Sequence, residues 1–594
     1  MIGRSLQAQI LARLNESPDR RCICFYGARE TVHWQSRSQL YSKSVAVAQQ
    51  LRQEGVCPGD ICIIVLPSGE NSVNALLATL LLGAVPLLIA PPTMVGGNLE
   101  LHQTLHGVLR STRPRVVVCS PSIKPDVAGF ESSFPAIKFV FPPDVEGMEL
   151  KNEPFAPVLP APTDIAAMQL TSGTTAAPRI CMWDHKGVLA ALDGMAAAMA
   201  LSAADLCANW TPLYHDMGLV NNFFLCLARG IPLVLLSPQE FARRPALWLR
   251  SLSQTGATIT WSPNFGFALT VRRAQDSEIE GVRLDHVRAF WNAAERIHAE
   301  TLDAFHCRFA TLGIRREALK TNFGCAENIG GATFSRANEL PPCEHIDCRF
   351  LEERGIARVS PATNDAEKIV LVSAGVAHPA LNIRILSPRG RVLPDGRVGE
   401  ICLDTPSRML RYHQNARETR RALRGGLLHT GDLGYLRNGH LFWVGRLRER
   451  ITIHSKKIDP SAFETIFAST LGLREGCFAA FGVPDEQLGT ERLIIVGEVR
   501  SPITESLKKL TATISRKCFL QLGITPGDIV LVPSGTLAKT SSGKRRHRYF
   551  RKFYLDGGLE QARMSLSDSM PVAAVAAQDT PESHLEPVSK LPLK

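Results

Sequence analysis

Short apolar segments alternate with helical segments through the first part of the chain, and this alternation limits the fold more than any other feature. Strands that alternate with helices form sheets with parallel strands, covered by helices on both faces. The expected strands span residues 60–66, 85–89 and 115–119, and the expected helices span residues 71–82 and 101–111. The same alternation continues between residues 165 and 323, so we predict the α/β fold class.

The strand expected at residues 165–170 runs directly into a loop of small and hydroxyl-bearing residues. Backbone N–H groups in such a loop can turn toward an anion, and hydroxyls and a guanidinium add donors for phosphate oxygens. A surface turn is the alternative, and the missing Gly-Lys-Ser/Thr ending disfavours a P-loop. We interpret the loop as a grip on the β- and γ-phosphates of ATP, made by Thr171, Ser172, Gly173, Thr174, Thr175 and Arg179.

Two later strands also end in loops that carry carboxylates. Residues 287–291 lead into the loop that ends at Glu295, and residues 319–323 lead into the loop that ends at Glu327. Ligands bind at the carboxyl ends of such strands, so these loops should face one crevice. Glu327 could hold Mg²⁺ bound to ATP, or it could be a carboxylate at a helix start. Phe323 could stack on adenine or belong to the core.

Two further motifs carry acidic residues in loops. His215-Asp216 could act as an acid–base pair, or Asp216 could cap a helix while His215 packs. Asp432 lies in a turn between glycines, where a carboxylate can accept both hydroxyls of a ribose. Taken alone, either motif is weak evidence for a site.

The pattern changes to short strands and Gly-rich turns from residue 370 onward. We expect a large domain of stacked αβ sheets with a β-rich subdomain over residues 1–445, and a small α+β domain over residues 446–560. A Gly-flanked loop of the small domain carries Lys544, a compact charge suited to an anionic transition state. Residues 565–594 have the composition of a disordered tail.

Charge and cysteine content restrict the partners and the compartment. The net charge of +11 favours acidic partners, and the fifteen scattered cysteines without a secretory signal indicate a cytoplasmic protein. We expect no nucleic-acid partner, because no groove-reading motif accompanies the basic run at residues 545–548. The most apolar stretch, residues 73–90, is interrupted too often to cross a membrane. Cys343, His345 and Cys348 lack the second pair that a zinc site of this spacing requires.

The ordered motif series resembles the adenylate-forming superfamily of acyl-CoA synthetases, peptide-synthetase adenylation domains and luciferases. Within the superfamily, the chain is most similar to fatty acyl-AMP ligases. The stretches that carry the broader match are 171–175, 323–327, 430–432, 445–446 and 539–544. The stretches that carry the narrower match are 210–218, 244–248 with 262–265, and a segment around 350–375. The last segment resembles an insertion that, in these ligases, restrains the small domain and so disfavours the use of CoA.

The resemblance implies ATP and Mg²⁺ as cofactors and a role for each motif. The phosphates lie against the Thr171–Thr175 loop, with Thr174 as a catalytic residue, and Glu327 binds Mg²⁺. Lys544 stabilises charge when the small domain closes, and His215 borders the acyl pocket. The remaining nucleotide contacts fall to Ala294, Glu295, Phe323 and Gly324 near the adenine, Asp432 at the ribose, and Arg446 at the ribose or phosphate.

The implied activity is activation of a fatty acid to acyl-AMP, with transfer to the phosphopantetheine thiol of a separate acyl carrier protein for lipid, polyketide or lipopeptide synthesis. A fatty acyl-CoA synthetase and a catalytically silent acyl or nucleotide binder are the alternatives. The sequence does not fix acyl length or oligomeric state. Four residues replace glycines that are common in the family: Ala176, Ala293, Arg411 and Ser455. The two alanines are small, so adenylation should survive them, whereas Arg411 and Ser455 leave the second half-reaction and its acceptor open.

Overall fold

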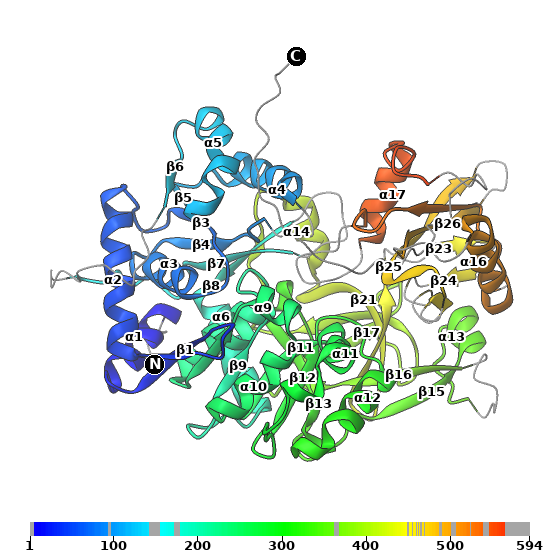
Figure 1. The fold of residues 1–594 in the computed structure, drawn as a ribbon, viewed down its shortest axis with the longest axis horizontal. Helices are drawn as coiled ribbons and strands as arrows, with labels where there is room; N and C mark the ends of the chain where they lie inside the picture. The colour runs from blue at the N-terminus through cyan, green and yellow to red at the C-terminus, as the bar shows by residue number, and fades with distance from the viewer. Residues whose placement is uncertain are drawn as a thin grey trace, which may run out of the picture.

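The computed structural model of this 594-residue chain describes residues 5–564, with gaps. The gaps are residues 93–96, 142–154, 172–178, 361–367, 448–450, 454–455, 459, 461–462, 464–465, 468–469, 486–489, 501–505, 523 and 538–545. Figure 1 shows how the elements formed by the described residues are arranged.

One sheet has seven strands in the order β19-β8-β7-β4-β3-β5-β6. Strands β7, β4, β3, β5 and β6 pair in parallel, whereas β8 and β19 pair antiparallel at one edge. The predicted strands at 60–66, 85–89 and 115–119 are confirmed as β3, β4 and β5. The strand bounds are β3 (Ile61–Val65), β4 (Val85–Leu88), β5 (Val116–Cys119), β6 (Lys138–Val140), β7 (Ile165–Leu170), β8 (Ile180–Asp184) and β19 (Arg411–Tyr412).

Helices follow the strands of this sheet as the alternation predicts. The helix α2 (Arg37–Gln53) begins with a capping box between Ser36 and Gln39, which satisfies backbone N–H groups at its start. It packs against α3 (Glu70–Leu81), the first part of the apolar stretch noted above. The predicted helices at 71–82 and 101–111 are confirmed as α3 and α4 (Gly97–Thr112), and α5 (Lys124–Ser133) follows β5.

The other large sheet has fifteen strands and changes character along its length. From β1 through β10, β9, β11 and β12 to β13 the strands run parallel, and beyond β13 the strands β14, β16, β22, β21, β18 and β17 pair antiparallel. The β-rich region therefore continues the parallel sheet through hydrogen bonds. The parallel strands are β1 (Arg21–Tyr26), β9 (Cys207–Asn209), β10 (Leu233–Leu236), β11 (Ile259–Pro263), β12 (Ala289–Ala293) and β13 (Leu319–Cys325).

The antiparallel strands are β14 (Gly330–Phe334), β16 (Lys368–Ala377), β17 (Asn382–Leu386), β18 (Gly399–Asp404), β21 (Leu427–Arg437) and β22 (His440–Arg446). Three further strands complete the sheet: β2 (Val32–Ser36) pairs with β1, β15 (Cys343–Asp347) with β16, and β20 (Leu423–Arg424) with β21. The helices along this sheet are α8 (Leu225–Arg229), α9 (Pro238–Arg243), α10 (Ala246–Thr255), α11 (Asn264–Arg273), α12 (Ala299–Phe309), α13 (Cys348–Arg354) and α14 (Ala416–Ala422).

Helix α6 (His185–Ala198) lies between the two sheets. It packs against β7 and β8 of the smaller sheet and against β14 of the larger one. The main core includes buried aromatic side chains from both sheets, among them Trp183 on β8 and Trp261 and Trp291, whose rings stack at 5.4 Å. Burying each such side chain contributes about 2–3 kcal/mol, so this shared core fixes the sheets against each other.

The segment after β22 has cores of its own. Strands β25 (Leu473–Asp485), β26 (Thr490–Val499) and β27 (Asp528–Val532) form a three-stranded sheet, and β23 (Ile451–Ile453) pairs with β24 (Lys456–Ile458). One face of the three-stranded sheet packs on α16 (Leu507–Leu522) and the other on α17 (His547–Leu555). These elements lie together in Figure 1, with α13 below β24. The division at residue 445 stays a proposal, and the tail at 565–594 lies outside the described residues.

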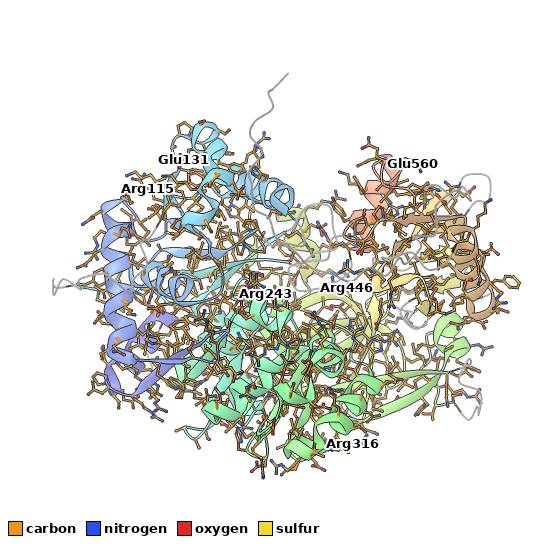
Figure 2. The ribbon with its side chains drawn as sticks, viewed as in Figure 1. Arg115, Glu131, Arg243, Arg316, Arg446 and Glu560 are labelled. Atoms are coloured by element: carbon orange, nitrogen blue, oxygen red, sulfur yellow. The ribbon has the colours of Figure 1, made fainter. Side chains whose placement is uncertain are left out.

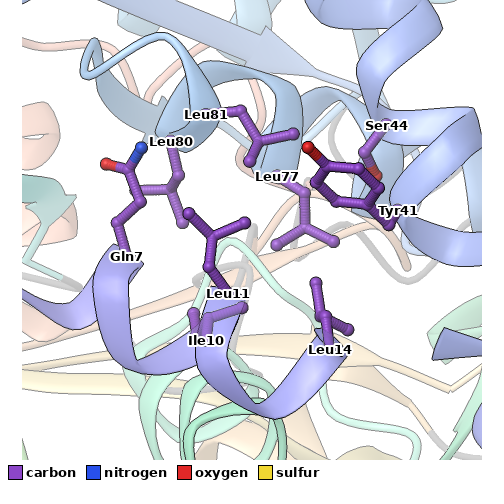
Figure 3. A pocket seen from close by; sticks show the side chains of 9 residues that line it. All are labelled: Gln7, Ile10, Leu11, Leu14, Tyr41, Ser44, Leu77, Leu80 and Leu81. Atoms are coloured by element: carbon purple, nitrogen blue, oxygen red, sulfur yellow. The ribbon is translucent and has the colours of Figure 1, made fainter. Parts of the chain in front are cut away.

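A small apolar pocket lies among α1 (Leu6–Glu16), α2 and α3 (Figure 3). Leu11, Leu77 and Leu81 help to line it. It has room for about one water molecule, too little for an acyl chain. Of the helices that the structure describes, none is both long and apolar enough to span a bilayer.

Candidate active site

Thr171 and Arg179 stand at the two ends of the predicted phosphate loop, where β7 ends and β8 begins. The Thr171 N–H donates to the Arg179 carbonyl oxygen at 2.8 Å, and the Arg179 N–H donates to Thr171 Oγ1 at 3.3 Å. These bonds close the strand pair just before the loop. The loop itself lies outside the described residues, so phosphate contacts stay predictions for Ser172, Gly173, Thr174 and Thr175.

The Arg179 guanidinium lies between two carboxylates and an aromatic ring. Its Nη2 is 3.5 Å from Glu327 Oε1, its Nη1 is 3.4 Å from Glu418 Oε2, and its Cζ is 4.6 Å from the centroid of the Tyr412 ring. The Tyr412 hydroxyl donates to the same Glu327 Oε1 at 2.6 Å. Burial and the Glu327 charge raise the pKa of Tyr412 far above its ordinary value, so this hydroxyl keeps its proton.

Backbone contacts fix the position of Glu327, which follows β13 in the short 3-10 helix η7 (Ala326–Asn328). Trp183 Nε1 donates to the Ala326 carbonyl oxygen, and the Met409 N–H donates to the Glu327 carbonyl oxygen, both at 2.8 Å. Ile329 follows with a φ of 57°, a left-handed conformation that β-branched residues rarely adopt. Strain of this kind persists where the surroundings impose it, often at functional sites.

Carboxylates from three elements act on the thiol of Cys325, a half-buried residue two positions before Glu327. Burial raises the pKa of Cys325 well above its ordinary value, and the carboxylates of Glu327, Asp432 and Asp216 raise it further. These carboxylates come from the end of β13, from β21 and from α7 (Asp216–Gly218). Carboxylates that gather in this way are suited to a divalent cation.

Asp432 on β21 lies directly opposite Arg446 on β22. Its Oδ1 accepts hydrogen bonds from Trp443 Nε1 and from Arg446 Nε, both at 3.1 Å, and its side chain is 4% exposed. Gly431, just before it, has a φ of 74°, which glycine adopts without strain. Arg446 lies toward the middle of the view in Figure 2. The two predicted ribose-site residues therefore form a pair, and their nucleotide contacts stay predictions.

The four residues predicted near the adenine follow two neighbouring parallel strands. Phe323 and Gly324 lie in the last part of β13, and Ala294 and Glu295 follow β12. A side chain at Gly324 would collide with the backbone of β14, and Ala294 has a φ of 72°. The Glu295 carboxylate accepts the N–H of Phe265 in the first turn of α11, so it already has a partner within the chain.

His215 begins α7 and is almost fully buried. The Met217 N–H donates both to His215 Nδ1, at 3.2 Å, and to Asp216 Oδ1. These two acceptor atoms lie 2.9 Å apart. The geometry matches the predicted helix start, with both side chains capping it. Proton transfer and contact with an acyl pocket stay predictions for His215.

Three residues at the site were not among those predicted: Tyr412, Glu418 and Trp443. Tyr412 follows Arg411, one of the positions where a family glycine is replaced, and that motif was the available signal. Glu418 and Trp443 belong to no motif, and they reach the site only because β19, α14 and β22 fold against it. Lys544 lies outside the residues that the structure describes.

Comparison with known proteins agrees with this arrangement. The family model for AMP-binding enzymes matches residues 10–413. The long-chain-fatty-acid–AMP ligase FadD26 of Mycobacterium marinum is 30% identical over 93% of this chain and 98% of its own length. The medium-chain-fatty-acid–[acyl-carrier-protein] ligase JamA of Moorena producens is 28% identical over 89% of this chain and 90% of its own.

A solved structure from work on the fatty acyl-adenylate ligases of E. coli and L. pneumophila superposes with a TM-score of 0.86 at 27% identity, covering 94% of this chain and 99% of that one. Fold and site together define an adenylate-forming enzyme. This chain belongs to the AMP-binding enzyme family, and the predicted resemblance to fatty acyl-AMP ligases is confirmed.

Proposed function

We propose that this protein activates a fatty acid with ATP, forming the acyl-AMP and releasing pyrophosphate. It then passes the acyl group to the phosphopantetheine thiol of a separate acyl carrier protein. The observation that carries the proposal is the gathering of Arg179, Glu327 and the Asp432–Arg446 pair at one end of the sheets. Similarity to fatty-acid AMP ligases over nearly the whole chain supports the choice of substrate.

Mg²⁺ fits the donors present at Glu327. The carboxylate and the Tyr412 hydroxyl offer oxygen atoms only, which suits a hard cation that takes one or two carboxylates plus phosphate oxygens. Glu327 would hold the ion, and Arg179 beside it would face the same phosphates. When bound, Mg²⁺ neutralises phosphate charge.

In the first step, a carboxylate oxygen of the fatty acid attacks the α-phosphorus of ATP. The new P–O bond forms as the bond to the oxygen that bridges toward the β-phosphate breaks, and pyrophosphate leaves with that electron pair. The chain positions the reactants and stabilises charge. Asp432 holds the ribose hydroxyls, oriented by Trp443 and Arg446. Lys544 brings its ammonium to the α-phosphate from the small domain.

In the second step, the phosphopantetheine thiol loses its proton to water and its sulfur attacks the acyl carbonyl carbon. The bond from that carbon to the phosphate oxygen breaks, and AMP leaves. The insertion around residues 350–375 bears on the choice of acceptor. Its helix α13 packs against β24 of the proposed small domain, which supports the idea that it restrains that domain and disfavours CoA. The net charge of +11 suits an acidic carrier.

The test uses the full chain, MgATP and a mixed pool of fatty acids. Mass spectrometry of the products should detect one dominant acyl-AMP, and labelled pyrophosphate should exchange into ATP only when that acid is present. No exchange with any fatty acid would favour the catalytically silent alternative. Supplying holo-carrier protein or CoA then separates the two acceptors, because a CoA synthetase would form acyl-CoA at least as fast as acyl-carrier thioester.

A further inference from the structure

Strands β18 and β21 bring a carboxylate, a thiol and an imidazole together beside the Asp432 turn. Cys402 lies directly opposite His429, and Glu400 lies two residues before Cys402 on the same strand. Cys402 Sγ is 3.2 Å from His429 Nδ1, and that nitrogen is 2.9 Å from Glu400 Oε2. All three potential ligand atoms lie within 4.8 Å of one another.

We propose that Glu400, Cys402 and His429 form a binding site for a borderline divalent cation of the Zn²⁺ type, separate from the Mg²⁺ site at Glu327. Thiolate, imidazole and carboxylate are the ligands that Zn²⁺ takes in proteins, whereas Mg²⁺ prefers oxygen donors alone. Three protein ligands leave a fourth position for water or another small donor.

A hydrogen-bonded network without metal is the alternative interpretation. Sulfur and carboxylate both approach the same ring nitrogen, however, and one proton on Nδ1 cannot be directed at both. A cation placed among the three atoms would contact each of them. With Zn–N of about 2.0–2.1 Å and Zn–S of about 2.3 Å, tetrahedral ligands stand about 3.3–3.6 Å apart. The sulfur and the carboxylate oxygen therefore each need to separate from His429 Nδ1 by only a few tenths of an ångström.

Neighbouring hydrogen bonds hold the ligands in place. Glu400 Oε1 accepts the Gly431 N–H at 3.3 Å, and the Thr430 hydroxyl donates to the Ile401 carbonyl oxygen at 2.8 Å. Such outer contacts orient metal ligands and tune their affinity. Burial raises the pKa of Cys402 to about 12, so the free thiol keeps its proton, which a bound cation would displace.

Arg424 lies over the cluster and competes with a cation. Its Nε donates to His429 Nε2 at 3.2 Å, and its Nη2 is 3.2 Å from Nδ1. With a cation on Nδ1, His429 Nε2 carries the ring proton and can no longer accept a hydrogen bond from Arg424. The Arg424 side chain is 56% exposed, so it has space to swing outward. Replacing it removes a like charge and should tighten cation binding roughly tenfold.

The test is calorimetric titration of the nucleotide-free full chain with Zn²⁺, together with absorption spectra of the Co²⁺-loaded protein. One Zn²⁺ per chain and a sulfur-to-cobalt charge-transfer band are expected. Cys402→Ser and His429→Gln should abolish the band and weaken binding by more than the roughly 10–100-fold that loss of an outer contact costs. The control Cys343→Ser changes an exposed cysteine that lies near His345 on β15, and it should keep both signals.

Arg424→Gln keeps all three ligands and so tests the site even where a ligand variant fails to fold. Tighter Zn²⁺ binding in Arg424→Gln supports the proposal, and unchanged or weaker binding contradicts it. Zn²⁺ binding that survives both Cys402→Ser and His429→Gln, or that disappears in Cys343→Ser, would place the metal elsewhere and overturn the proposal.

Discussion

Tyr412 donates its hydroxyl hydrogen to Glu327 at 2.6 Å, although the two residues are 85 positions apart in the chain. The same Tyr412 ring lies under the Arg179 guanidinium. One aromatic side chain therefore orients the proposed Mg²⁺ carboxylate and supports the proposed phosphate-binding cation. It does so from β19, which pairs with β8 of the smaller sheet.

Replacing Tyr412 with phenylalanine removes that hydrogen bond and keeps the ring. A hydrogen bond to a charged group contributes about 1.5–3 kcal/mol, so Tyr412→Phe should raise the KM for MgATP roughly 10–100-fold. Pyrophosphate exchange at varied MgATP measures the effect. The control is Tyr554→Phe on α17, where a hydroxyl also donates to a carboxylate, that of Asp528, in the proposed small domain. Equal KM values for wild type and Tyr412→Phe would contradict the role.

Asp432→Asn keeps the size of the side chain and removes the charge that the ribose hydroxyls are proposed to meet. We expect roughly 10–100-fold weaker binding of ATP, because an amide accepts fewer hydrogen bonds than a carboxylate. Asp404→Asn makes the same chemical change in an exposed pair with Arg384 on the same sheet and should leave binding unchanged. Calorimetric titration with ATP measures the affinity of each variant. A similar loss of ATP affinity in both variants would indicate a general effect of charge and contradict a specific role for Asp432.

Lys544→Ala should keep nucleotide binding and lose most adenylation, about 10²–10³-fold in kcat, since the lysine is proposed to act only on the charge of the transition state. Titration with ATP and pyrophosphate exchange separate the two effects. The control Lys552→Ala removes an exposed lysine of α17 that pairs with Asp556. Full adenylation by Lys544→Ala would refute the assignment.

Acid should destabilise the fold through two buried histidines. Burial lowers the pKa of His185 to about 4 and that of His378 to about 4, from 6.5. Between these values the unfolded chain binds protons that the folded chain does not. The free energy of unfolding is therefore unaffected by these two histidines above pH 6.5. It decreases as the pH falls toward 4, by roughly 3 kcal/mol for each histidine.

The measurement is the melting temperature between pH 7 and pH 4. In the double variant His185→Gln, His378→Asn the melting temperature should depend less on pH than in the wild type. The variant His33→Gln changes an exposed histidine and should keep the dependence of the wild type. A double variant with an undiminished pH dependence would rule out these two residues as its source.

Ala294 carries backbone strain that glycine would relieve. A non-glycine residue in the left-handed region costs about 1–2 kcal/mol, and the extra chain entropy of glycine offsets about 0.5–1 kcal/mol of the gain. Ala294→Gly should therefore stabilise the protein by up to about 1.5 kcal/mol. Ala293→Gly, one residue earlier in β12, should destabilise it by about 0.5–1 kcal/mol. Thermal melts compare the stabilities of the two variants. A lower melting temperature in Ala294→Gly than in the wild type would contradict the proposed strain at Ala294.

Local patterns predicted several strands and helices of the parallel sheets, because a buried parallel strand reads as an apolar run and a helix as a 3.6-residue period. The strand at 165–170 was predicted with the bounds that the structure gives it. Pairing between distant segments was not predictable in this way. The contact of Arg179 with Glu418 spans 239 residues, and the passage of the sheet from β13 into antiparallel β14 leaves no periodic signal.

The fifteen-stranded sheet carries both Glu327, after β13, and Asp432, on β21. Hydrogen-bonded strand pairs through β14, β16 and β22, some of them with register shifts, join their two strands. The sheet thus sets the spacing between the carboxylate proposed to hold the metal and the carboxylate proposed to hold the ribose. Rotation of the proposed small domain after β22 would leave that spacing unchanged, so we expect selection of the nucleotide and delivery of the acyl group to depend on separate parts of this protein.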